Sequence, residues 1–463
     1  MINHIFQKST YWFAGLAIIF IVSFAFAQRG EAVNQKELSV KKTPTYLAKI
    51  NTQDNVTPPI DLENASSQYD RLMFELDQRI DAYPQDYEAS LLKVFAYIES
   101  ADFISANILL DDLIKRKPEF NIAHLVKGDL LMMQVKPIEG VGKNQLLASV
   151  LKNKKQIELN NLRDELNSRI QSYHEKTVHN KIPRSLLLMS KSVATALLID
   201  KSKNRLYVFQ RQNDLLPPKM IQNFYVSTGK LRGNKLIKGD LKTPEGVYFV
   251  TKWIPDASLP DKYGIGAFPV DYPNELDNRM GKTGYGIWLH GTTRDSYSRP
   301  PLDSEGCVVL PNIDLEAIKH LITPGKTPII IAESIDWIEY NDWSRTRKNV
   351  LSSIEQWRQD WQSLDVERYL THYDDEFWSG RHNLKTWSAR KRRLAQSKKY
   401  QAIKFDDISL FAYPDNASSK DIIVARFHQS YKSNNYTSDM NKRIYLTQND
   451  KTTQHWKIIF EGK

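Results

Sequence analysis

Two neighbouring stretches of the chain decide its interpretation: Gly286-Ile287-Trp288-Leu289-His290-Gly291-Thr292 and Ser304-Glu305-Gly306-Cys307-Val308-Val309-Leu310-Pro311-Asn312. His290 ends an apolar run typical of a strand, and Cys307 begins another. Two such strands lying side by side would bring the imidazole and the thiol within hydrogen-bonding distance. A thiol, whose free pKa is about 8.5, needs a neighbouring base or cation to attack as the thiolate. The spacing therefore predicts a cysteine nucleophile with a histidine base.

The glycine before the cysteine supports the same chemistry. Gly306 would let a ligand approach the backbone closely, and the amide groups of Gly306 and Cys307 can face a carbonyl oxygen as an oxyanion hole. The alternative is an inert cysteine in a core strand, since such strands also read Cys-Val-Val-Leu. Cys307 is the only cysteine of the chain, and it lies downstream of a His-Gly pair. These features favour acyl transfer.

The composition bounds the class of protein. A chain of 463 residues has room for about three domains. Hydrophobic residues make up 41% and charged residues 25%, which excludes wholesale disorder and a membrane protein with many spans. The formal net charge of +10 favours anionic surroundings without naming a partner.

The N-terminus carries one long apolar run, Tyr11–Ala27. It ends in Ala25-Phe26-Ala27, a pattern of the kind that signal peptidase cuts. We interpret residues 1–27 as a signal peptide. The alternative is an uncleaved inner-membrane anchor, because the run is near the lower limit of ~17 residues for crossing a bilayer. Both place the chain in the periplasm or cell envelope, and the polar residues 28–62 then form a linker.

Residues 63–180 show apolar side chains at helical spacing. Pro84 and Pro118 each open a helix, about 34 residues apart, with Ala89 and Ala123 at matching positions. The pattern resembles degenerate tetratricopeptide repeats. An ordinary helical bundle is the alternative. Under either interpretation this part is a candidate docking module for envelope proteins or for dimerisation.

Residues 188–335 change to a β pattern. Short strand-like runs at 196–200 and 205–210 flank a turn and predict a hairpin. In residues 350–463 the pattern changes again, with helix-like spacing through Tyr373 and a helical part closed by Phe377 and Trp378, followed by strands. Helices followed by a sheet resemble the NTF2-like α+β cone, a fold that encloses a pocket.

Around His290 and Cys307 the sequence resembles the YkuD type of L,D-transpeptidase catalytic domain, whose pattern is His-Gly, a loop, and then Ser/Thr-x-Gly-Cys. The resemblance also includes the stretches 242–248, 272–274 and 281–284. It implies that Cys307 is the nucleophile and His290 its base. The further site residues that it implies are Gly291 in the turn fixing the imidazole, Ser304 and Gly306 in the oxyanion loop, and Asn312.

Three positions leave open either their own role in the site or the reaction that the site catalyses. Asn312 precedes a helical pattern, so a helix N-cap is the alternative to site support. Val309 stands where many family members carry arginine, which removes an expected cation. Glu305 replaces a frequent histidine and puts a carboxylate beside the nucleophile. With the NTF2-like tail, this motif resembles the helical-cell-shape L,D-carboxypeptidases more than the cross-linking enzymes.

The sequence therefore predicts a multidomain α+β protein with a helical, tetratricopeptide-like N-terminal module, a mainly-β YkuD-type domain and an NTF2-like C-terminal domain. The expected function is a cysteine acyl-transfer enzyme that acts on peptidoglycan stem tetrapeptides through a thioester, in cell wall biogenesis and cell shape. One alternative is an L,D-carboxypeptidase that trims tetrapeptide to tripeptide. Another is a non-catalytic murein-binding scaffold. The oligomeric state stays open.

Competing motifs fail on their spacing. His174 and His179 are separated by five positions, whereas a zinc peptidase helix needs four. Gly281-Lys282-Thr283 lacks the first glycine of a phosphate loop, since Leu276 stands there. The basic run Arg390–Arg393 is typical of a solvated helix face. We expect no metal, no cofactor and no nucleic-acid partner.

Overall fold

The computed structural model describes residues 65–135, 140–142, 154–174, 181–414, 421–448 and 455–462. They belong to one compact unit, Ile60–Lys463. The predicted signal peptide or anchor at 1–27, the linker at 28–62 and His179 lie outside the described residues. So do 136–139, 143–153 and 175–180 of the predicted helical module. In the described part of the chain, every helix is too short or too polar to cross a bilayer.

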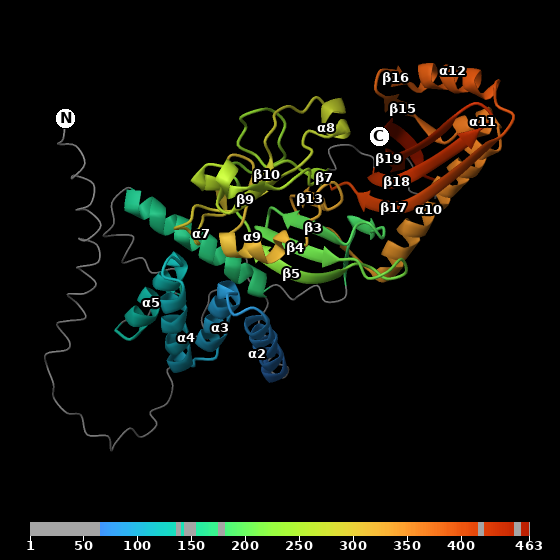
Figure 1. The fold of residues 1–463 in the computed structure, drawn as a ribbon. Coiled ribbons are helices and arrows are strands. Elements are labelled where there is room, and N and C mark those ends of the chain that lie inside the picture. Colours follow the sequence, from blue (N-terminus) through green and yellow to red (C-terminus); the bar gives the residue numbers. More distant parts are fainter. Residues whose placement is uncertain are drawn as a thin grey trace, which may run out of the picture. The chain divides into compact units, whose positions relative to one another are not determined.

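The N-terminal module is helical, as predicted (Figure 1). Its helices are α2 (Ala65–Ala82), α3 (Tyr87–Glu99), α4 (Phe103–Arg116) and α5 (Asn121–Met133), followed by the long α7 (Lys154–His174). Asp86 caps α3 by accepting the N–H of Ala89 at 2.8 Å, which satisfies a backbone donor that the helix leaves unpaired. The apolar faces of α3, α4, α5 and α7 meet in one core around Leu110 and Leu113, both fully buried, whereas α2 packs through Leu76 in a smaller cluster with Ala89 and Leu92 of α3.

The central domain contains a five-stranded sheet of order β5-β4-β3-β13-β7. Its strands are β3 (Thr195–Asp200), β4 (Arg205–Gln210), β5 (Lys219–Tyr225), β7 (Gly246–Phe249) and β13 (Pro328–Ala332). The predicted hairpin is confirmed, since β3 and β4 pair antiparallel with Leu197 opposite Val208. β13 pairs parallel to β3, so the chain crosses over between them.

A second sheet of order β12-β10-β9-β8 packs on this first sheet. Its strands are β8 (Ile254–Pro255), β9 (Gly266–Pro269), β10 (Trp288–His290) and β12 (Val308–Val309). Buried aliphatic and aromatic side chains from both sheets fill the space between them, together with α9 (Asn312–Lys319). The short elements around it are η1 (Asp256–Ser258), η2 (Asp261–Tyr263), α8 (Glu275–Arg279), β6 (Thr228–Gly229) and β11 (Leu302–Ser304).

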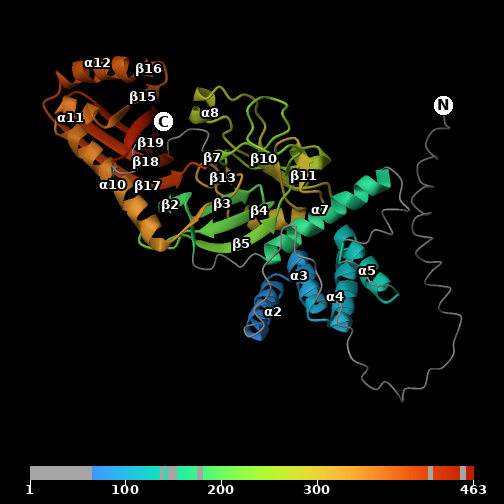
Figure 2. The same cartoon turned by 180° about the vertical axis from the view of Figure 1, so that it is seen from behind.

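The C-terminal domain is α+β, as predicted. Its helices are α10 (Tyr340–Gln362), α11 (Val366–Leu370) and α12 (Leu384–Ala395). Its sheet has the order β16-β15-β20-β19-β18-β17-β2. The strands are β2 (Leu186–Leu188), β15 (Tyr373–Ser379), β16 (His382–Asn383), β17 (Gln401–Ala412), β18 (Asp421–Ser433), β19 (Thr437–Gln448) and β20 (Lys457–Gly462). Figures 1 and 2 show α10 running along this sheet.

One local prediction is wrong. Tyr373, Phe377 and Trp378 belong to strand β15 and not to the helical part. Tyr373 and Phe377 lie on the buried face of this strand in the C-terminal core, and residues four apart share a face in a strand as well as in a helix, so their spacing did not separate the two.

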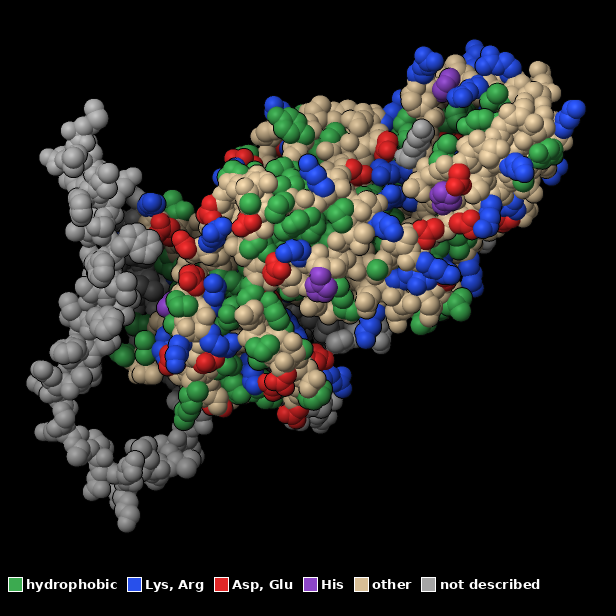
Figure 3. Space-filling view, viewed as in Figure 1, with side chains coloured by type: hydrophobic (Ala, Val, Ile, Leu, Met, Phe, Trp, Pro, Cys, Tyr) green, Lys and Arg blue, Asp and Glu red, His purple; other side chains and the backbone are tan. Residues whose placement is uncertain are grey.

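The central and C-terminal domains share a core. Ala196 and Leu198 of β3 lie in one buried cluster with Phe411 and Val424 of the C-terminal sheet. Strand β2 joins that sheet, and β1 (Ile182–Pro183) pairs with β14 (Trp337–Ile338) where the chain enters and leaves the central domain. Basic side chains gather on the surface of α12 (Figure 3). Arg390, Arg392 and Arg393 of the basic run are exposed, and Arg392 pairs with Glu367, whereas Lys391 is directed into a cavity and is not part of a solvated face.

Candidate active site

The pairing of β10 with β12 places His290 and Cys307 on one face. The strands are parallel, with Leu289 opposite Val308, and both of these side chains are buried in the core between the sheets. Because successive side chains alternate across a sheet, His290 and Cys307 point to the opposite face. His290, at the end of β10, and Cys307, immediately before β12, therefore lie on the same face of adjacent strands. Residues 291–303, which join β10 to the end of β11 at Ser304, are called the active-site loop below.

The imidazole of His290 is held in one orientation. Its Nδ1 lies 2.6 Å from the carbonyl oxygen of Gly291. A carbonyl oxygen only accepts hydrogen bonds, so Nδ1 carries the proton and Nε2 keeps a free lone pair. The ring of Tyr263 packs edge-on against the imidazole, with the two ring centroids 4.9 Å apart. Burial lowers the pKa of His290 to about 4, so the imidazole is neutral near pH 7 and able to take up a proton.

Asn312 holds two backbone segments, one that follows this histidine in sequence and one that precedes β9. Its Oδ1 accepts the N–H of Thr292 at 3.1 Å and the N–H of Ile265 at 3.2 Å. The alternative prediction, a helix N-cap, is wrong, because Pro311 occupies the cap position of α9. Asn312 instead joins the start of the active-site loop to the segment before β9.

Gly291 is required by this arrangement. A Cβ atom at Gly291 would lie 2.1 Å from Oδ1 of Asn312, far inside van der Waals contact. The same oxygen would lie 1.9 Å from a Cβ at Gly264, which adopts a φ of +61°. Two glycines therefore make room for one asparagine side chain, and any larger residue would displace the turn that carries the His290 hydrogen bond.

Ser304 and Gly306 shape the turn before the nucleophile in a way that differs from the prediction. Ser304 Oγ donates to the Cys307 carbonyl at 2.6 Å and accepts the Gly306 N–H at 3.1 Å. The Gly306 N–H is therefore already bonded and is not an open oxyanion donor. The space beside Gly306 is also taken, because a Cβ there would lie 2.8 Å from the Lys242 carbonyl oxygen. Gly306 accommodates backbone and not a ligand.

The Cys307 thiol is half-buried and donates to the carbonyl oxygen of Gly286 at 3.4 Å. Burial raises its pKa, while the backbone N–H of Trp288 and the charges of Arg299 and Lys262 lower it. Glu305 raises the pKa of the thiol further, because its negative charge disfavours the thiolate. In the resting site the sulfur is therefore protonated.

Arg299 is a functional candidate that the motif analysis missed. It lies in the active-site loop, where its Nε is 3.1 Å from Oδ2 of Asp303. Its charge acts on both His290 and Cys307, which makes it a candidate cation of the site. The signal in the sequence was an arginine followed by Pro300 and Pro301, a stiff segment between the histidine and the cysteine.

In the described residues, no group of His, Cys, Asp and Glu side chains is arranged to hold a metal.

These pKa shifts predict the alkylation behaviour of the protein. Because burial raises the pKa of Cys307, the thiolate fraction stays small at pH 7 and grows as the pH rises through and above 9. We expect iodoacetamide to label Cys307 more slowly at pH 7 than it labels free cysteine. Peptide mass spectrometry across pH 6–10 measures this. A labelling rate that is already at its plateau below pH 7 would show a preformed thiolate and contradict the assignment.

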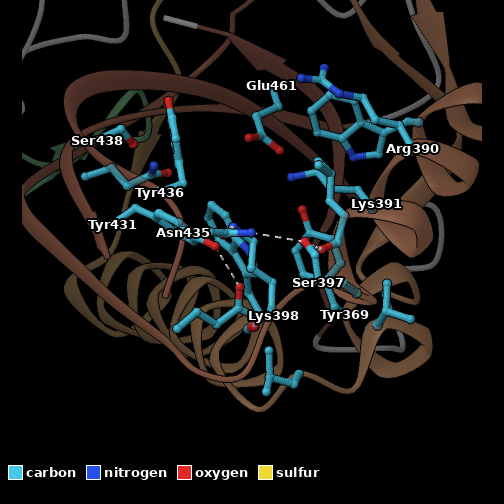
Figure 4. A pocket seen from close by; sticks show the side chains of 18 of the residues that line it. Tyr369, Arg390, Lys391, Ser397, Lys398, Tyr431, Asn435, Tyr436, Ser438 and Glu461 are labelled. Atoms are coloured by element: carbon cyan, nitrogen blue, oxygen red, sulfur yellow. Dashed lines mark hydrogen bonds between the residues drawn. The ribbon is translucent and has the colours of Figure 1, made fainter. Parts of the chain in front are cut away.

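A separate cavity of about 520 Å³ lies in the C-terminal domain (Figure 4). Aromatic side chains line it, namely Trp361, Tyr369, Trp387, Tyr431 and Tyr436. The amine of Lys391 lies 4.4 Å from the centroid of the Trp387 ring, and burial lowers its pKa to about 8. Figure 4 shows this amine directed toward the carboxylate of Glu461. None of the residues lining the cavity belongs to the site around Cys307.

Comparison with known proteins agrees with this geometry. A model of the L,D-transpeptidase catalytic domain, YkuD, matches residues 194–331, and a model of the Cds6 C-terminal NTF2-like domain matches residues 349–462. The solved structure of Bd1075 from Bdellovibrio bacteriovorus is 30% identical and has a TM-score of 0.53. The match covers 61% of this chain and 98% of that one.

The helical cell shape determining protein Pgp2 from Campylobacter jejuni is 26% identical, with a TM-score of 0.52. That match covers 61% of this chain and 95% of that one. Among curated proteins, none matches the chain. The two solved structures and the two domain models together identify the family.

Proposed function

The chain belongs to the family in which an L,D-transpeptidase catalytic domain is joined to a C-terminal NTF2-like domain, and we propose that it modifies peptidoglycan with Cys307 as its nucleophile. The substrate class is the stem tetrapeptide. The observation that carries the proposal is the pairing of β10 with β12. It leaves a neutral, oriented His290 and the Cys307 thiol on one face.

The first step is acylation. Nε2 of His290 takes the thiol proton while Sγ of Cys307 attacks the carbonyl carbon between the third residue and the terminal D-Ala. The carbon–nitrogen bond then breaks, and the imidazolium returns the proton to the leaving amine. D-Ala departs, and the rest of the stem stays on the enzyme as a thioester. Before the attack, the thiol must turn from the Gly286 carbonyl toward the imidazole.

Positive charge supports this step. Negative charge develops first on sulfur and then on the substrate oxygen, and Arg299 and Lys262 are the cations that act on the sulfur. The low pKa of His290 disfavours transfer of the thiol proton to the imidazole, because the imidazolium that forms is a strong acid. That property favours rapid return of the proton to the leaving group.

The acceptor decides the product. Water gives the tripeptide, which is L,D-carboxypeptidase action, and an amine from a second stem gives a cross-link. A cross-linking enzyme must keep water from the thioester in a second, shielded subsite. Position 309 lacks the common arginine, and Glu305 is exposed beside the nucleophile. We therefore propose hydrolysis as a major activity.

The product ratio tests this. We expect disaccharide tetrapeptide, incubated with the protein and excess acceptor stem, to yield mainly free tripeptide. Liquid chromatography with mass spectrometry counts both products, and the Cys307→Ala protein is the control. Dimers linked between third residues that outnumber tripeptide would contradict trimming and favour transpeptidation. Unchanged tetrapeptide would favour the third candidate, a murein-binding scaffold.

We further propose that the protein is exported and acts in the periplasm or cell envelope, with or without a retained N-terminal anchor. The proposal rests on the sequence of residues 1–27 and on the substrate. Because Pgp2 is a helical cell shape determining protein, we also propose a role in cell shape. Fractionation of cells and microscopy of a deletion strain test these two points.

A further inference from the structure

The active-site loop contributes an aromatic side chain to the core of the helical module. Tyr297 is only 2% exposed, and the other buried members of its cluster all come from α3, α4, α5, the turn before α5, and α7. Its ring lies 4.7 Å from that of Phe120 and 5.6 Å from that of Tyr87, edge-on to both. The segment between the two catalytic residues is thus anchored in a different module.

A buried charged cluster joins the same module to the central sheet. Arg169 of α7 and Arg205 of β4 both donate to the carboxylate of Glu88 on α3, each at 2.9 Å. Burial alone would raise the pKa of Glu88, but Arg205 and Arg169 lower it to about 2. A buried carboxylate shared by two arginines is costly to separate from either. The interface between α3, α7 and β4 is therefore held by paired charges.

This cluster reaches the backbone of Arg299. The guanidinium of Arg169 lies 4.1 Å above the ring of Tyr225, and the Tyr225 hydroxyl donates to the Arg299 carbonyl at 2.8 Å. On the other side, burial raises the pKa of Glu165 to about 7 against the opposing effects of Arg169 and of the Arg299 backbone N–H. The Tyr225 hydroxyl of β5 therefore holds the carbonyl of Arg299, and the Glu165 carboxylate of α7 is influenced by its N–H.

The module also contacts the structure behind His290. The hydroxyl of Tyr83, just after α2, donates to the carbonyl oxygen of Ile313 at 3.2 Å. Ile313 follows Asn312, whose side chain holds the N–H of Thr292 at the start of the active-site loop. The helical module is therefore connected to the beginning and to the later part of this loop.

We propose that the helical module positions the active-site loop, and that Tyr297 is the positioning residue that holds Arg299 in the part of the loop from which its charge acts on the Cys307 thiol. The inference rests on the proposed function, because it assigns Arg299 a part in that reaction. The two family models match residues 194–331 and 349–462, so neither includes the module. In this chain the active site is completed by a part that the domain matches do not describe.

The test compares two aromatic truncations in the full chain. Tyr297→Ala removes the anchor, and Tyr97→Ala removes a partly buried ring of the same module core that belongs to α3. We expect Tyr297→Ala to lower kcat on tetrapeptide by roughly tenfold or more, with a smaller change in KM. Tyr97→Ala should stay within about twofold of the parent. Equal effects of the two variants would overturn the proposal.

A second readout needs no substrate. With Arg299 displaced, the thiol loses a cation that lowers its pKa, so iodoacetamide labelling of Cys307 should shift to higher pH in Tyr297→Ala. General loss of stability would move the profile in the opposite direction, to lower pH, because the exposed thiol of an unfolded chain labels like free cysteine. An unmoved profile would overturn the proposal. If the wild-type protein leaves tetrapeptide unchanged, the proposed function fails, while the labelling profile still decides the positioning role.

A double variant tests whether Tyr297 acts through Arg299. If Tyr297 acts through Arg299, then adding Tyr297→Ala to Arg299→Gln should cause little further loss, whereas independent effects would multiply and contradict the account. Tyr225→Phe serves where Tyr297→Ala does not fold, because it removes only the hydroxyl that donates to Arg299 and keeps the ring over Arg169. It should shift the labelling profile in the same direction, and no shift would overturn the proposal.

Discussion

Cys307→Ala is expected to lower turnover of tetrapeptide by more than about a thousandfold, because no other group in the site can form the thioester. The fold should survive, since alanine keeps most of the packing of a small, half-buried thiol. We expect the melting temperature to change by less than about 4 °C. Product analysis by mass spectrometry and a thermal melt measure the two effects on the same sample.

Cys307→Ser is the matched variant, because it keeps the size and replaces only the sulfur. It should be as inactive as the alanine variant, since a hydroxyl is far less acidic than a thiol. Either variant with activity within about threefold of the parent would remove Cys307 from the role of nucleophile.

His290→Ala is expected to lower kcat by about a hundredfold to ten-thousandfold, the range for loss of a general base. The wild-type pH profile carries a second expectation. Burial lowers the pKa of His290 to about 4, and the base must be neutral, so activity should persist as the pH falls below 6.5. The acidic limb of kcat/KM should appear only as the pH approaches 4.

His320→Ala is the control, because His320 is an exposed histidine at the end of α9. It should leave the rate and the profile unchanged. An acidic limb of kcat/KM near 6.5 would show that His290 titrates like a solvated imidazole, and full activity in His290→Ala would show that another group accepts the thiol proton.

The sequence predicted the sheet pairing at the site because its signal is local. An apolar run ending in His290 and another beginning after Cys307 were enough to place two adjacent strands, and these are β10 and β12. The hairpin of β3 and β4 followed from the same alternation. By contrast, β2 pairs with β17, a contact between distant segments for which local periodicity carries no information.

The geometry around the predicted residues needed the structure. Sequence spacing could not choose between a cap and a support role for Asn312, because both begin with an asparagine before a helix. It also left the Gly306 N–H available to a ligand, whereas the hydroxyl of Ser304 occupies it. These outcomes depend on side-chain directions across a turn.

The roles of Tyr297 and Arg299 were out of reach for another reason. Both lie in a loop without periodicity, and their partners Phe120 and Tyr225 come from other parts of the chain. Only tertiary packing brings them together. Pro300 and Pro301 restrict the backbone at the end of the loop, but they do not indicate what holds it.

The central claim, a thioester on Cys307, is tested most directly by the intact mass of the protein after brief mixing with disaccharide tetrapeptide and an acid quench. The account predicts an added mass equal to the substrate minus D-Ala, mapped by proteolysis to the peptide that contains Cys307, together with free D-Ala in solution. An adduct on another residue, or tetrapeptide left intact with no D-Ala released, would contradict it.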